Sequence, residues 1–90
     1  MESENARDIM KASIAQSVEQ AVQDATDTLR NISTMETTVI GVASAKWLAD
    51  PVNVAYKEII DNAKENIQFA VSNLSAVGEA SAKILQELDV

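Results

Sequence analysis

The chain of 90 residues has no cysteine and no histidine, and it has only one proline, two glycines and three aromatic residues. Without cysteine it forms no disulfide and no thiolate metal site. Without histidine it lacks the usual general base, the usual zinc ligand and the serine–histidine pair of many hydrolases. These absences argue against an enzyme, and we expect no catalytic residue, no cofactor and no metal.

Positive charge is also scarce, because the chain has 7 basic and 14 acidic residues and a net charge of −7. Nucleic-acid binders need a basic face, so we expect no nucleic-acid partner. No uncharged run approaches the ~20 apolar residues of a membrane-spanning helix, and we expect no transmembrane segment. The first residues are acidic and polar, unlike a secretory signal. We therefore expect a cytoplasmic protein.

The clearest boundary in the chain is Asp50-Pro51. Aspartate is favoured just before a helix and proline in its first turn, which predicts a turn at 49–51 and a helix over about 51–87. Apolar and small residues recur there at steps of three and four, as in an amphipathic helix. This stripe consists of Tyr56, Ile59, Ala63, Ile67, Ala70, Leu74, Val77, Ser81, Ile84 and Leu88, and a second row of Val52, Ile60, Val71, Ala82 and Leu85 widens it.

The first half of the chain shows the same helical period and predicts a helix over about 4–48. Its stripe consists of Met10, Ile14, Val18, Ala21, Ala25, Leu29, Ile32, Val39, Ala43 and Trp47. Threonine and serine between residues 31 and 38 compete for backbone hydrogen bonds, so a bend or a break there is the alternative. Because the apolar phase recovers beyond this stretch, we favour one long helix.

Together these patterns predict an all-α fold, in which residues 1–90 form a single domain as a long antiparallel two-helix hairpin. A lone hairpin covers each helix on one side only and encloses no core. We therefore expect an oligomeric protein, covered by copies of itself, by another protein or by an apolar surface.

One short internal repeat stands out, because residues 41–48 and 78–85 are identical at six of eight positions. Each copy places glycine and alanine four residues apart, a spacing that lets helices approach closely. The alternative is a chance similarity between alanine-rich helices. If the repeat is a packing motif, Gly41, Ala45, Gly78 and Ala82 contact neighbouring subunits, because a turn near residue 50 puts Gly41 opposite about residue 59 and Gly78 opposite about residue 22.

Aromatic residues supply two further candidates for contacts between subunits, Trp47 and Phe69. Trp47 and Tyr56 flank the predicted turn, and the alternative is that they simply close the end of the hairpin. Phe69 lies beside the main stripe, where an exposed aromatic side chain indicates an intermolecular contact. The acidic clusters alternate with lysines at helical spacing and are typical of a solvated face.

The segment from Ile14 to Asp50 resembles the RebB-type structural proteins of R-bodies, also called the killing-trait family. The matching residues are Ala15-Gln16-Ser17, Gln23-Asp24-Ala25-Thr26, and Thr37-Thr38 shortly before Gly41-Val42. Residues 27–30 depart from the glutamine-rich run of that family. The resemblance implies a bacterial cytoplasmic protein that polymerises with itself, and with paralogous helical subunits, into a coiled ribbon that extends under a trigger such as acid.

Two short runs, 25–29 and 62–67, also resemble phasins, which coat polyhydroxyalkanoate granules with amphipathic helices. Asp50-Pro51 in a hairpin is similar to needle-type secretion subunits, and a helical adaptor fits the same pattern. The leading prediction is a non-enzymatic protein that self-assembles into an ordered polymer. Coating of an apolar granule, or a role as an adaptor or needle-type subunit, is the alternative.

Overall fold

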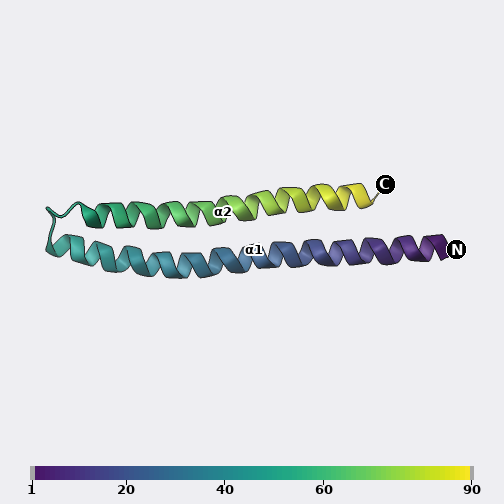
Figure 1. Ribbon diagram of the computed structural model, residues 1–90, viewed down its shortest axis with the longest axis horizontal. Coiled ribbons are helices and arrows are strands. Elements are labelled where there is room, and N and C mark those ends of the chain that lie inside the picture. The colour runs from purple at the N-terminus through teal and green to yellow at the C-terminus, as the bar shows by residue number, and fades with distance from the viewer. Residues whose placement is uncertain (1, 90) are drawn as a thin grey trace.

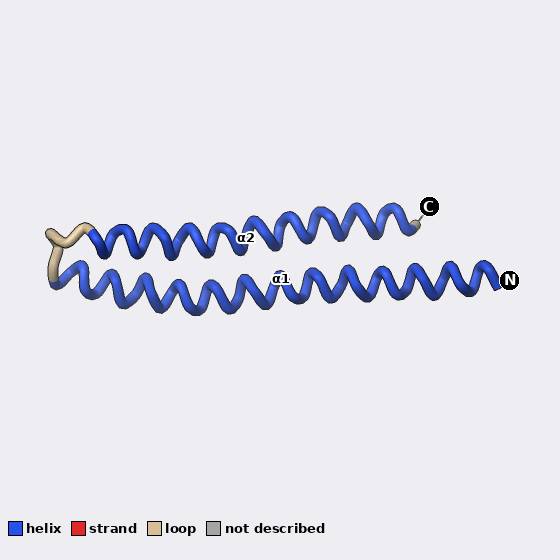
Figure 2. The backbone as a smooth tube through the Cα atoms, in the orientation of Figure 1, coloured by secondary structure: helices blue, strands red, loops and turns tan. Residues whose placement is uncertain are grey.

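The computed structural model describes residues 2–89, with side chains from residue 4 onward. Helices α1 (Glu2–Ala49) and α2 (Ala55–Leu88) run antiparallel, side by side (Figure 1). A short loop joins them at one end, and residues 2–89 contain no strand (Figure 2). The predicted all-α two-helix hairpin is confirmed.

Helix α1 continues without a break through residues 31–38, as predicted for one long helix. The Thr34 hydroxyl donates a hydrogen bond to the Arg30 carbonyl oxygen at 2.9 Å, and the Thr38 hydroxyl donates to the Thr34 carbonyl oxygen at 3.0 Å. Each hydroxyl thus bonds the carbonyl one turn earlier while the helix persists around it. The threonines of this stretch therefore do not end or interrupt the helix.

The start of the second helix was predicted wrongly, because α2 begins at Ala55 and not at Pro51. The Asn53 backbone N–H donates to the Asp50 carbonyl oxygen at 3.1 Å and closes a turn. The Asn53 side-chain oxygen then accepts a hydrogen bond from the Ala55 N–H at 3.1 Å. The residue at the N-cap position of α2 is Val54, whose side chain makes no capping hydrogen bond. Asn53, one residue before it, thus bonds the first N–H of α2, and the turn extends beyond the predicted 49–51.

A narrow seam joins the two helices, and its positions alternate by three and four residues as in a coiled coil. Its buried members are Val18, Ala25, Ala43, Ile60, Ala63, Ala70 and Ser81. Four of these seven are alanines, which bury little apolar surface each. No described side chain is fully buried. The seam therefore aligns the helices but provides only a small core.

Several predicted stripe residues lie outside this seam. Ile60 is buried while Ile59 is 43% exposed, and on α1 Met10 is 61% exposed. Ala21 is exposed and Val39 is 37% exposed, whereas Val22 is half-buried. A pair of helices buries only about two positions in seven of each helix. The wider apolar face predicted for α2, apart from Ile60, therefore remains uncovered.

The hairpin is long and thin, with Cα extents of 73 × 16 × 11 Å and a radius of gyration of 20.6 Å. A compact domain of this length has a radius of gyration of about 12 Å. The chain exposes 6806 Å² of surface, whereas a compact monomer of the same mass exposes about 5,100 Å². The hairpin thus exposes about 1,700 Å² more surface than a compact fold would.

Candidate association surfaces

The register of the hairpin agrees with the predicted pairing of distant residues. Gly78 and Val22 line the same groove, as expected for a turn near residue 50. The Asn66 side-chain amide donates a hydrogen bond to Glu36 Oε2 at 2.7 Å, further along the same seam. These pairs fix which segments of α1 and α2 form each surface.

The Gly78 groove lies between the helices toward the open end of the hairpin, with a volume of about 680 Å³. Its walls include Ala15, Val22 and Thr26 from α1 and Gly78, Ala82 and Leu85 from α2. A Cβ atom added to Gly78 would meet no other atom within 4 Å. Two of the six residues predicted for self-association, Gly78 and Ala82, therefore line one open and mostly apolar groove.

A second groove, the Ser17 groove, opens on the opposite broad face and has a volume of about 400 Å³. Its walls include Ser17 and Ala21 from α1 and Ala80 and Ile84 from α2. Val18 and Ser81 line both grooves. Ala21 and Ala80 line the Ser17 groove, whereas Val22 and Ala82 line the Gly78 groove on the other side of the seam. One thin layer of side chains therefore separates the two grooves.

Phe69 lies on the same face as the Ser17 groove. Residues that are seven apart share one face of a helix in such a pair, as do positions 21, 28 and 35 of α1 and positions 66, 73 and 80 of α2. Phe69 is 70% exposed and Met35 is 62% exposed, and both line a groove of about 350 Å³. We call this side of the hairpin the Phe69 face. The exposure predicted for Phe69 is confirmed, whereas Met35 was not recognised from the sequence as a contact candidate.

Gly41 and Ala45 lie on the back of α1, on the side away from α2, since the seam passes through Ile40, Ala43 and Trp47. All three residues Gly41, Val42 and Ala45 are exposed, and a Cβ atom at Gly41 would meet nothing within 4 Å. These residues continue an uncharged strip that begins with Thr34 and Thr38 on the same side. The strip thus forms a smooth edge of the hairpin.

The two copies of the internal repeat occupy different environments. Ala43 is buried, whereas its counterpart Ala80 is exposed. Ser44 is half-buried, whereas its counterpart Ser81 is buried. The seam therefore crosses the two copies one residue apart, and within the hairpin they do not form one packing motif used twice.

Trp47 is half-buried at the closed end of the hairpin, and its indole Nε1 donates a hydrogen bond to the Pro51 carbonyl oxygen at 3.2 Å. This contact supports the alternative in which Trp47 closes the turn. Around it the apolar tip is open: Leu48 is 84%, Val52 is 88% and Val54 is 68% exposed. The tip is therefore a further uncovered apolar surface.

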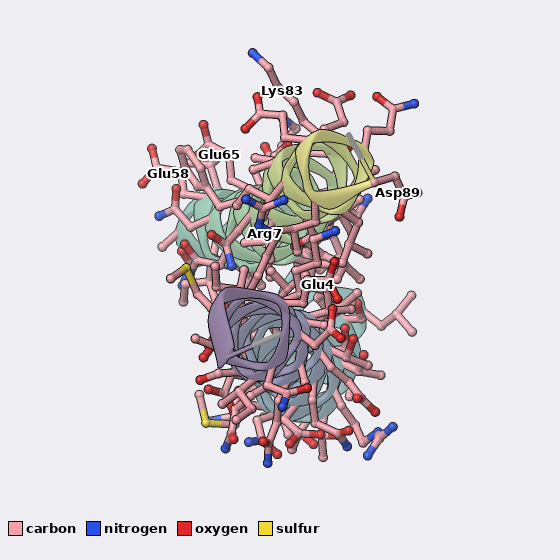
Figure 3. The ribbon with its side chains drawn as sticks, turned by 90° about the vertical axis from the view of Figure 1, so that its right-hand side faces the viewer. Glu4, Arg7, Glu58, Glu65, Lys83 and Asp89 are labelled. Carbon is pink, nitrogen blue, oxygen red and sulfur yellow. The ribbon has the colours of Figure 1, made fainter. Side chains whose placement is uncertain are left out.

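Charged side chains gather on the outer side of α2. Glu58, Glu65 and Lys83 point away from α1 when the hairpin is viewed along its length (Figure 3). Between residues 66 and 78, by contrast, α2 has no charged residue on any side. That run flanks Phe69, and it is a signal in the sequence that could have indicated the whole Phe69 face.

No protein-family model, curated protein or solved structure matches this chain. No helix within residues 2–89 is long and apolar enough to cross a membrane. In the same described range, no group of acidic side chains is arranged to hold a metal ion. The grooves and the exposed apolar residues are thus the surfaces through which this hairpin could contact a partner.

Proposed function

We propose that this protein is a non-enzymatic structural subunit that packs laterally through its helices into an ordered polymer. The excess of about 1,700 Å² over a compact monomer is the surface that such packing would cover. A standard protein interface buries about 800 Å² on each partner. The excess therefore corresponds to about two interfaces for every chain.

The observation that carries the proposal is the pair of grooves on opposite faces of the Val18–Ser81 layer. A neighbour that covers one face leaves the other face open for the next neighbour. Contacts on opposite sides of a subunit generate open assemblies unless a rotation closes them into a ring. We therefore expect stacks of hairpins rather than a single closed dimer.

Within this assembly, each predicted contact residue has a distinct place. Gly78 and Ala82 admit a neighbour into the Gly78 groove, and Phe69 contacts a neighbour across the opposite face. Gly41 and Ala45 form the smooth edge along which stacks lie side by side, which would widen a filament into an R-body-like ribbon. Trp47 acts mainly by closing the turn, at the end of each hairpin.

Imaging of the purified protein by negative-stain electron microscopy tests this proposal, with a matched pair of variants. Ala82→Glu places a carboxylate in the Gly78 groove, whereas Gln86→Glu adds the same charge one turn later, outside the residues that line the groove. We expect ribbons or filaments from the wild type and from Gln86→Glu, and loss of order in Ala82→Glu. Discrete small oligomers in images of the wild type would overturn the proposal of a polymer.

The apolar tip favours a second candidate, a coat on an apolar granule. Leu48, Val52 and Val54 are the kind of exposed apolar side chains that insert into a hydrophobic surface. Binding to hydrophobic polymer beads separates the two functions. Under the coat hypothesis Val52→Asp abolishes bead binding, whereas under the polymer hypothesis the wild type forms ribbons without beads.

A further inference from the structure

We infer that the Phe69 face pairs with the same face of a second copy, antiparallel, across a two-fold axis. In this pair Phe69 and Met35 of each hairpin enter the Ser17 groove of the other. The inference rests on the proposed function, since it specifies one of the two interfaces that self-assembly needs. Such a contact is self-complementary, as a two-fold interface must be.

Protrusion and groove are both present on this one face. Phe69 and Met35 are the large apolar side chains that stand out from it, at 70% and 62% exposure. The walls of the Ser17 groove combine small residues, among them Ala21 and Ala80, with larger apolar residues such as Ile84. The opposite face has its own groove, but its largest apolar wall residue, Leu85, is only 41% exposed. A protruding aromatic side chain therefore distinguishes the Phe69 face.

The spacing of these features along both helices is consistent with a single axis. On α2, Phe69 and Ala80 have their midpoint near residue 75, and on α1, Met35 and the segment 17–21 have their midpoint near residue 27. Because Asn66 bonds Glu36 across the seam, residue 27 lies opposite about residue 75. One two-fold axis near these positions thus brings both protrusions of each copy over the groove of the other.

The two grooves of this face hold little charge, although each copy carries −7. Among the residues that line its two grooves, Glu36 alone is charged, and it already accepts the Asn66 hydrogen bond. On the outer side of α2, Glu58 and Glu65 would meet their own copies (Figure 3). Asp24, between Ala21 and Thr28 on α1, and Glu65, one turn before Phe69 on α2, border these grooves, so salt should strengthen the pairing by screening them.

The area of the face is also sufficient. The segment 14–36 of α1 and its counterpart on α2 form a strip about 33 Å long and about 20 Å wide, from a rise of about 1.5 Å per residue and a helix width of about 10 Å. This footprint of about 650 Å² is close to the ~800 Å² per partner of a standard interface.

Disulfide trapping tests the pairing directly, because the native chain has no cysteine. A disulfide requires two Cα atoms within about 7 Å. We expect a mixture of Phe69→Cys and Ala80→Cys proteins to form the mixed covalent dimer under mild oxidation. Phe69→Cys alone should not cross-link to itself, because the two copies of residue 69 lie about 16 Å apart along the helices.

Two further mixtures keep the test decisive. Met35→Cys with Ser17→Cys should also cross-link, and this pair leaves Phe69 intact. Phe69→Cys with Ala82→Cys should not, since Ala82 lines the groove on the opposite face. Equal cross-linking in all mixtures, or none in either expected pair, would overturn the inference.

Sedimentation of the wild type separates this failure from that of the proposed function. If the wild type assembles and the expected pairs do not cross-link, the Phe69 face is covered by something other than its own copy. The proposed polymer then stands, and only the pairing is wrong. If the wild type is a monomer, both proposals fail.

Discussion

Asn66 on α2 donates a 2.7 Å hydrogen bond to the Glu36 carboxylate on α1, between residues 30 apart in the chain. Among the side-chain hydrogen bonds of residues 4–89, it is the one that links the two helices. An alanine-rich seam specifies its register weakly, because small side chains interlock little. This polar pair therefore supports the alignment that the short loop between Ala49 and Ala55 imposes on the two helices.

We predict that Asn66→Ala lowers the free energy of unfolding by about 1 kcal/mol, the usual net contribution of a hydrogen bond. Asn62→Ala is the matched control, because Asn62 is an exposed asparagine one turn earlier on the same helix. Chemical denaturation followed by circular dichroism measures both, at one protein concentration because association adds to apparent stability. Equal losses in the two variants would show that the pair does not set the register.

Substitutions of the two glycines separate helix stability from assembly. A Cβ atom fits at Gly41 and at Gly78 without a contact, so alanine at either position should stabilise the helix by about 1 kcal/mol. Gly78→Leu should also keep the hairpin helical, yet it fills the Gly78 groove and should stop assembly at the two-fold pair formed through the Phe69 face. Gly41→Leu should prevent stacks from lying side by side, and leave single filaments.

Light scattering and circular dichroism together check these glycine predictions. If a leucine variant keeps the helicity of the wild type while its light scattering falls, the glycine position lies in a contact between subunits. If both leucine variants assemble like the wild type, neither glycine position lies in a contact between subunits.

Replacement of the single tryptophan tests its role at the turn. Trp47→Phe keeps the aromatic ring but removes the hydrogen bond to the Pro51 carbonyl oxygen, and it should lower the free energy of unfolding by about 1 kcal/mol. Tyr56→Phe, which removes a hydroxyl that bonds to none of the described residues, should change it less. Thermal unfolding by circular dichroism compares the two. A larger loss from Tyr56→Phe would contradict the closing role of Trp47.

Acid should strengthen association. Assembly crowds subunits of charge −7, so the assembled state binds more protons than the free hairpin, and association gains as pH falls. Carboxylic side chains ordinarily titrate near pH 4, and the chain has no histidine. Light scattering should therefore rise between about pH 6 and 4 and stay flat from about 6.5 to 8. A sharp transition near pH 7 would refute this carboxylate account.

Much of the fold follows from the sequence, because helical periodicity is a local property. The steps of four and three through Ala63, Ile67 and Ala70 predict α2 and its buried side. The start of α2 is harder to predict, since Val54 at the N-cap position is not a favoured cap and the backbone turn closed between Asp50 and Asn53 decides where the helix begins. The choice of Ile60 over Ile59 for the seam depends likewise on the partner helix.

The surfaces are less predictable than the helices. The exposure of Phe69 follows from its place beside the stripe, but its proximity to Met35 depends on the register of the two helices, which the sequence pattern of one helix does not contain. The internal repeat suggested two equivalent patches. The seam crosses them differently, which places Gly78 in a groove and Gly41 on the back of α1.

Sedimentation velocity of the wild-type protein at low micromolar concentration shows whether a single hairpin exists alone in solution. We predict that the chain sediments as large, concentration-dependent assemblies, because a thin hairpin with 6806 Å² of exposed surface has too little core to be stable as a monomer. A single helical species with the mass of one chain, 9.7 kDa, that melts cooperatively at that concentration would contradict it.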